Sequence, residues 1–152
     1  MIAPKLTHYF DCYVDIAPAL DLGKTSEGHR LVFNILGGRF EGPYASGEML
    51  PGGADWQLIR NDGVTEIDVR ATMRTNDGVT IGTQSIGIRH ASQEVTKKIL
   101  NGEAVPSDAY YFKTTPRYQV PEGYYPELIQ KVFVGIGFRK PKEVGIKVFA
   151  VD

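Results

Sequence analysis

Two Asn-Asp-Gly triplets, Asn61–Gly63 and Asn76–Gly78, constrain the fold of this chain more than any other feature of its sequence. Asp-Gly supplies the positive φ angles of a type I′ turn, which joins two antiparallel strands through a tight hairpin. The three segments that flank the triplets are 56–60, 64–75 and 79–89, and their residues alternate or favour strands. The sequence therefore predicts an antiparallel meander of three strands.

Alternation and composition extend the strands to both ends of the chain. Further strands are predicted at 6–16, 29–36 (closed by Gly37-Gly38), 110–115, 132–139 and 144–151, whereas 17–28 and 118–123 are predicted to be irregular. One surface helix is expected over 92–101, because Ser92 can cap it and Gly102 can end it. A single helical turn is expected after Pro126. About eight strands in consecutive order predict one domain, residues 1–152, that forms a closed antiparallel β-barrel in lipocalin-like up-and-down order.

The segment from Gly37 to Trp56 holds six glycines and ends in an acid followed by the only tryptophan of the chain. Such a density of glycine is tolerated where the backbone needs positive φ angles or a close approach. Pro51–Gly53 is predicted to form a tight corner that brings Asp55 and Trp56 to one place. An ordinary barrel corner and the mouth of a cleft both fit this pattern.

Several short motifs of the chain occur in a familiar order. They are Gly37–Pro43, Pro51–Trp56, Asp68–Arg70, Thr75–Gly78 and Tyr111–Pro116. In this order they resemble the domain-of-unknown-function 3237 family, also called uncharacterised protein family 0311. The resemblance covers nearly the whole chain and implies a small single-domain β-barrel. It implies no particular activity.

Composition excludes several classes of partner. The net charge is −1 and the basic residues are spread along the chain, so neither nucleic acid nor an anionic membrane is an expected partner. Neither a secretory leader nor a long apolar run is apparent, which favours the cytoplasm. A lone cysteine, Cys12, excludes an internal disulfide.

Metal and cofactor chemistry is not expected either. His8, His29 and His90 are scattered, without the spacing of a common metal site. The chain also has no phosphate-binding glycine loop, so no cofactor is predicted.

The predicted strand 64–75 carries charged residues on one face and apolar residues on the other. Alternation alone favours a charged face in water, with the apolar face filling the barrel. The family resemblance, in which Asp68 and Arg70 belong to a motif, favours a polar pocket instead. Buried charges of this kind would have to be paired.

The first functional hypothesis is an enzyme without a cofactor, acting on a small aromatic or carbonyl-containing compound as an isomerase, cyclase or lyase. Asp55 would be the general acid/base, Arg70 an electrostatic clamp, and Tyr111 or Lys113 a proton donor. Asp55 and Arg70 are expected in one polar site at the barrel mouth. The residues expected to line the ligand site are Trp56, Asp68, Arg89, Phe40 and Tyr118.

Two other classes of function remain open. The barrel could carry a similar small ligand without catalysis, because aromatic walls with few polar groups also describe a binding pocket. It could also be a structural subunit that forms a homo-oligomer through apolar strand faces. Turnover of candidate substrates separates the enzyme from the carrier.

Overall fold

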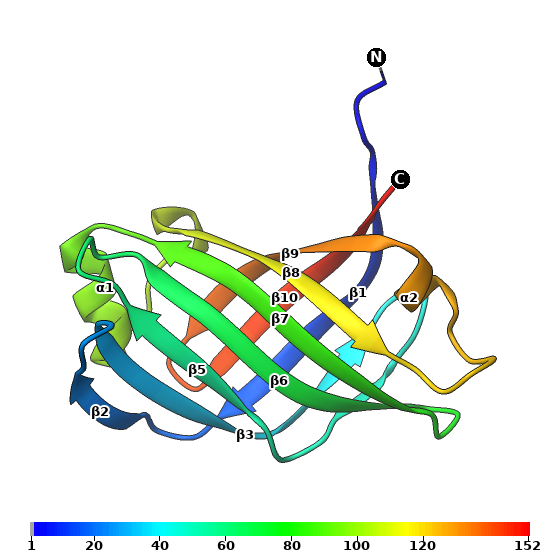
Figure 1. Ribbon diagram of the computed structural model, residues 1–152, viewed down its shortest axis with the longest axis horizontal. Coiled ribbons are helices and arrows are strands. Elements are labelled where there is room, and N and C mark those ends of the chain that lie inside the picture. Colours follow the sequence, from blue (N-terminus) through cyan, green and yellow to red (C-terminus); the bar gives the residue numbers. More distant parts are fainter. Residues whose placement is uncertain (1) are drawn as a thin grey trace.

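The computed structural model describes residues 2–152, which form a closed antiparallel barrel (Figure 1). Its strands are β1 (Leu6–Ile16), β2 (Leu20–Lys24), β3 (His29–Glu41), β4 (Gly47–Met49), β5 (Ala54–Ile59), β6 (Thr65–Thr75), β7 (Thr80–His90), β8 (Tyr111–Gln119), β9 (Val132–Lys140) and β10 (Glu143–Val151). The barrel closes because β1 pairs with both β10 and β3. Strands β4 and β5 share one position between β3 and β6, while β2 adds to the edge of β3. Eight positions in up-and-down order confirm the predicted fold.

The two Asp-Gly hairpins lie where the sequence places them. Gly63 and Gly78 have φ angles of 87° and 90°, and they join β5 to β6 and β6 to β7. The prediction of a three-strand meander is therefore confirmed.

Helices cover the two ends of the barrel (Figure 1). Helix α1 (Gln93–Leu100) begins at Ser92, whose Oγ accepts a hydrogen bond of 3.1 Å from the Val95 amide. Helix α2 (Glu127–Gln130) lies at the opposite end, and a short 3₁₀ turn, η1, spans Ser107–Ala109. Within residues 2–152, no helix has the length and apolar character that crossing a bilayer requires.

Three predicted boundaries are wrong. The segment 17–28 contains β2, in which Leu20 pairs with Val32, and β8 continues to Gln119. Strand β3 does not end at Gly37-Gly38 but continues to Glu41. The two glycines have φ angles near 143° and let β3 bend while it keeps pairing with β1.

The interior changes character from one end of the barrel to the other. Near α2 it is filled by large apolar side chains, including Phe10, Phe40, Met73, Ile81 and Val148, each at most 1% exposed. Near α1, buried polar and charged side chains lie beside a smaller apolar cluster of Ile16, Leu31 and Phe33. An apolar cavity of about 70 Å³ lies between the two ends of the interior.

Candidate functional site

Three strands bring four polar side chains together inside the barrel, at the end that α1 covers. Asp55 and Gln57 come from β5, Arg89 from the end of β7 and Arg139 from the end of β9. All four are buried, with exposed fractions of 5%, 1%, 3% and 7%. On β5 the inward positions are 55 and 57 because alternate residues of a strand face opposite sides. We call these four residues the polar cluster.

Gln57 connects the carboxylate of the polar cluster to one of its guanidinium groups. Its Nε2 donates to Asp55 Oδ2 at 2.7 Å, and its Oε1 accepts from Arg89 Nη2 at 3.4 Å. The backbone amide of Asp68 donates to Asp55 Oδ1 at 3.2 Å. Within the described part of the chain, no arginine lies within ion-pair distance of Asp55. The acid is therefore linked to Arg89 through an amide rather than by direct contact.

Aromatic rings support both arginines. The guanidinium carbon of Arg89 lies 5.8 Å from the centroid of the Phe112 ring, and that of Arg139 lies 5.3 Å from the Phe33 ring. Gly137 makes room for Phe112, since a Cβ atom at this glycine would lie 2.6 Å from that ring. Such cation–π contacts stabilise a desolvated guanidinium group in part.

Each arginine also keeps an unused donor. Neither Arg89 Nη1 nor Arg139 Nε has a hydrogen-bond partner among residues 2–152. Other atoms of the same side chains are fixed: Arg89 Nη2 donates to Gln57, and Arg139 Nη1 donates to the carbonyl of Lys140. Unpaired buried donors are rare in folded proteins, so they mark this cluster as a place where a ligand could bind.

Burial shifts the charge states of the polar cluster. It raises the pKa of Asp55, although Gln57, the Asp68 amide and the two arginines act in the opposite direction. Burial also lowers the pKa of Arg89 to about 10, and the nearby charge of Arg139 contributes to this shift. The pKa of Arg139 is lowered by burial too. The net effect is a pKa of Asp55 above the ordinary value of an aspartate, the direction found in many catalytic acids.

The raised pKa of Asp55 predicts a pH-dependent stability. In the unfolded chain an aspartate has a pKa of about 3.9, so the folded state holds this proton more tightly. The stabilisation that the protonated Asp55 gives to the folded state is fully present below about pH 4, and it is lost as pH rises through the folded-state pKa of Asp55. We expect the free energy of unfolding to fall, relative to that of Asp55→Asn, as pH rises above about 4. Urea unfolding of both proteins measures this, and a constant difference would contradict the prediction.

The cavity beside the polar cluster is apolar apart from a few groups. Its walls include Val14, Ile67, Val69 and Ile146, and Asp55 borders it. Burial raises the pKa of the Cys12 thiol, which also lines the cavity, to about 12. Burial also raises the pKa of Tyr118 well above its ordinary value. Asp55 is the carboxyl group of the described lining, and it is therefore the candidate for proton exchange with a bound compound.

A second pocket, of about 780 Å³, lies at the α1 end and is called the mouth pocket here. Arg89 and Arg139 line it, together with Ile99 of α1, while Ile16 lines both this pocket and the cavity. The polar cluster thus lies between the mouth of the barrel and its apolar interior.

The structure separates the predicted site residues into two groups. Asp55, Arg89, Phe40 and Tyr118 point inward and are buried. Phe40 belongs to the apolar packing near α2 rather than to the polar cluster. Arg70, Tyr111, Lys113, Trp56 and Asp68 lie on the outer face of the barrel wall.

The prediction that Asp55 and Arg70 share one polar site is wrong. In the β5–β6 pair, Ala54 lies opposite Arg70 and Asp55 lies opposite Val69. Paired residues share a face, so Asp55 points inward with Val69 while Arg70 points outward. The alternative that placed the charged face of β6 in water is correct. On that face Arg70 Nη2 donates to Gln84 Oε1 at 3.3 Å, and Gln84 Nε2 donates to Asp68 Oδ1 at 3.4 Å.

The expected proton donors also lie outside. Strand β8 alternates strictly, with Phe112 and Thr114 inward and Tyr111 and Lys113 outward. The Tyr111 side chain is 54% exposed, and the Lys113 ammonium lies 5.2 Å from its ring centroid. Neither side chain can donate a proton to a compound in the cavity from this position.

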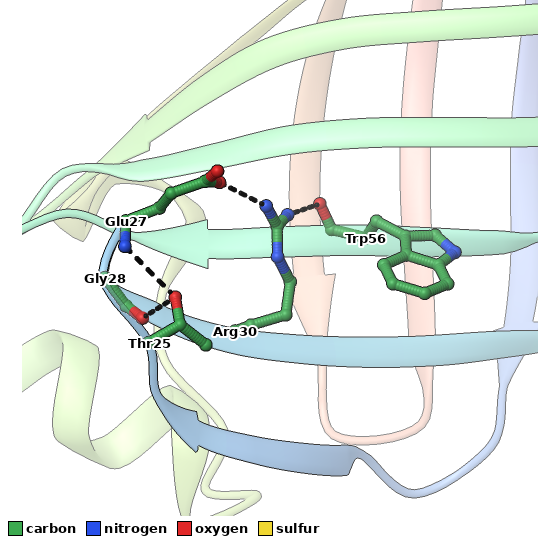
Figure 2. Close-up of polar contacts among 5 residues, drawn as sticks. All are labelled: Thr25, Glu27, Gly28, Arg30 and Trp56. Carbon is green, nitrogen blue, oxygen red and sulfur yellow. Dashed lines mark hydrogen bonds and ion pairs between the residues drawn. The ribbon is translucent and has the colours of Figure 1, made fainter.

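Trp56 likewise lies on the outer surface, where half of it is exposed. Figure 2 shows its backbone carbonyl accepting a hydrogen bond of 3.2 Å from Arg30 Nη1. Arg30 Nη2 also pairs with Glu27 at 3.4 Å. These contacts connect β3 to β5 and the 25–28 turn. Asp55 and Trp56 are consecutive residues of β5, so strand alternation places them on opposite faces of the wall. The prediction that the corner at Pro51–Gly53 brings them to one place is wrong.

Two members of the polar cluster, Gln57 and Arg139, were not singled out from the sequence. Alternation contains a signal for both. Gln57 lies two residues after Asp55 and therefore on the same face. On β9 the buried face contains Phe133, Gly135, Gly137 and Arg139. Arg139 therefore continues a face that begins with apolar residues, and alternation places it inside the barrel.

Among the described residues, no group of three or more His, Cys, Asp or Glu side chains could hold a metal ion.

Comparison with known proteins gives the chain a family. Residues 4–151 match the family model described as "Protein of unknown function (DUF3237)". The chain belongs to the DUF3237 family. A UPF0311 protein of Rhodopseudomonas palustris is 33% identical over 144 residues, which is 95% of this chain and 94% of that protein. The resemblance inferred from the short motifs is therefore confirmed.

Solved structures share the DUF3237 barrel. The crystal structure of a Rhodopseudomonas palustris protein of unknown function has a TM-score of 0.96 at 32% identity, covering 100% of both chains. A "beta-barrel like protein" of Acinetobacter baumannii has a TM-score of 0.85 at 36% identity, covering 100% of this chain and 98% of its own. An enzyme from Penicillium herquei has a TM-score of 0.74 at 15% identity, with coverages of 100% and 97%. This last similarity shows the fold alone.

Proposed function

We propose that this DUF3237 barrel binds a small aromatic or carbonyl-containing compound in its interior cavity. We further propose that it acts without a cofactor as an acid/base enzyme of the isomerase, cyclase or lyase type. The observation that carries this proposal is Asp55, a buried acid with a raised pKa on the wall of an apolar cavity. Eight-stranded barrels have room for one small ligand.

Asp55 is the proposed group for proton transfer. In its neutral form it can donate a proton to a carbonyl or alkene, and its carboxylate can accept one from an adjacent carbon or hydroxyl. Gln57 would hold the carboxyl group in place through the 2.7 Å hydrogen bond. Arg70, Tyr111 and Lys113 have no part in this proposal, because they lie outside the cavity. The description of the Penicillium herquei neighbour as an enzyme agrees with catalysis on this fold.

A non-catalytic carrier is the second candidate. Because Tyr111 and Lys113 point outward, Asp55 is the main acid/base group beside the cavity. A cavity with so few acid/base groups favours binding without catalysis. Cytoplasmic residence and self-association, both expected from the sequence, also remain predictions.

Filling the cavity tests whether ligands bind there. Ala71 lines the cavity, so Ala71→Leu would occupy part of its 70 Å³. Ligand-observed NMR with a panel of monocyclic aromatic aldehydes and ketones should detect binding to the wild type and at least a tenfold weaker signal in this variant. Thr72→Leu, on the opposite face of the same strand, serves as the control. Equal binding to both variants, or no binding to the wild type, would contradict the proposal.

Compounds that bind then separate the enzyme from the carrier. If the barrel is an enzyme, Asp55→Asn should lower the rate of conversion by about 10²–10⁴-fold and leave binding nearly unchanged. Conversion is followed by NMR after prolonged incubation with each compound. Binding without any conversion by the wild type would favour the carrier.

A further inference from the structure

We infer that the ligand of this barrel is an organic monoanion, a carboxylate, whose charged group is held by Arg89 and Arg139 at the α1 end. This inference rests on the proposed function, because it names the chemical class of the compound that enters the same cavity. Its basis is the polar cluster and the mouth pocket.

The first observation is an imbalance of charge. Three charged side chains are buried within residues 2–152: Arg89, Arg139 and Asp55. Two guanidinium groups therefore face one carboxyl group, and the net charge of the three is positive in either protonation state of Asp55: +1 when it is ionised and +2 when it is neutral. Buried charge without a partner is costly, and a bound monoanion would offset it.

The second observation is the set of unused donors. Arg89 Nη1 and Arg139 Nε find no acceptor in the described part of the chain, and the Arg89 side chain is only 3% exposed. Arg89 Nη2 is held by its hydrogen bond to Gln57, and Arg139 Nη1 by its hydrogen bond to the Lys140 carbonyl. Arginine donors match the geometry of a carboxylate better than that of a neutral amide or ketone.

The third observation is a route for the ligand. Both arginines line the mouth pocket, whose other walls include Leu31, Phe33 and Ile99. A ligand bound there by its carboxylate would direct its apolar part past Ile16, which lines both pockets, toward the cavity and Asp55. A free phosphate lacks such an apolar part and suits this arrangement less well.

Matched pairs of acids and amides test the inference. The probes are phenylacetate and phenylacetamide, benzoate and benzamide, cinnamate and cinnamamide, and inorganic phosphate, titrated by calorimetry at pH 7. At least one acid should bind the wild type ten times more tightly than its amide. Arg89→Gln and Arg139→Gln should each weaken that acid at least tenfold. Arg117→Gln, which removes an exposed arginine of the outer face of β8, should not.

Folding controls keep the result interpretable. Thermal unfolding checks each variant, and Arg89→Lys provides a second substitution that keeps the charge but loses the fork of donors. We expect this variant to bind the acid with intermediate affinity. Affinity equal to that of the wild type would contradict the proposed role of the guanidinium group.

Each other outcome has a distinct meaning. If an amide binds as tightly as its acid, or both glutamine variants keep full affinity, the anion inference is overturned and the proposed function stands. Phosphate that binds as tightly as the best acid would overturn the assignment to carboxylates. Failure of all acids would overturn the inference as well, whereas the proposed function is decided separately by the aldehydes, the ketones and Ala71→Leu.

Discussion

Replacing Gly53 with alanine is expected to lower the free energy of unfolding by about 3–5 kcal/mol. Gly53 has a φ angle of 78°, which residues with a Cβ atom rarely adopt. A Cβ at this position would also lie 2.1 Å from the backbone carbonyl oxygen of Arg70. Because that atom belongs to the neighbouring strand β6, it cannot move without disturbing the pairing with β5.

Gly63→Ala is the matched control. Gly63 has a similar φ angle of 87°, but no atom lies within 4 Å of the position of its Cβ. This substitution should cost only the backbone strain, about 1–2 kcal/mol. Denaturant unfolding of both variants measures the difference, which isolates the close approach of β5 to β6. Equal losses of stability would show that the contact with Arg70 is unimportant.

The second large effect is a gain in stability. Arg89→Met is expected to raise the free energy of unfolding by about 1–3 kcal/mol. The folded state lowers the pKa of Arg89 from 12.5 to about 10, a shift that corresponds to about 3 kcal/mol against its charged form. This balance already includes the favourable attraction of Asp55. Methionine removes the charge and the unpaired Nη1 donor while filling a similar volume.

The pH dependence gives this prediction a sharper form. A base whose pKa is lowered on folding carries its full penalty below the folded-state value and loses the penalty as pH rises above it. The gain from Arg89→Met should therefore persist at pH 9 and decrease as pH rises above about 10. Arg117→Met, on the outer face, should change stability by less than about 0.5 kcal/mol. Destabilisation by Arg89→Met would mean that the buried charge supports the fold rather than a ligand.

A stabilising loss of a buried arginine would also bear on function. Proteins retain unfavourable groups mainly at binding and catalytic sites, where the unbound state carries strain that a ligand relieves. Addition of a tightly bound carboxylate should stabilise the wild type through mass action but not Arg89→Met. Together, the two measurements would show that Arg89 destabilises the unbound protein and binds the carboxylate.

The sequence predicts local structure well in this protein, because turns, caps and alternation depend on neighbouring residues. Asp-Gly pairs fixed the two hairpins, and Ser92 and Gly102 bounded α1. Alternation on β8 or β9 separates two faces but does not tell which face points inward when both contain polar groups. For this reason Tyr111 and Lys113 could be grouped correctly and still be assigned to the wrong side.

The sequence by itself determined the order of the strands and the proximity of Asp55 to Arg70 across one hairpin. Only the tertiary structure decided that the two residues lie on opposite sides of the wall. Arg70 pairs with Ala54 rather than with Asp55, and a difference of one residue in register reverses the face. Closure of the barrel decided the grouping of Arg89 with Arg139, since the two residues lie on β7 and β9, which β8 separates. Their side chains share one pocket because a closed barrel turns the inner faces of all its strands toward one axis.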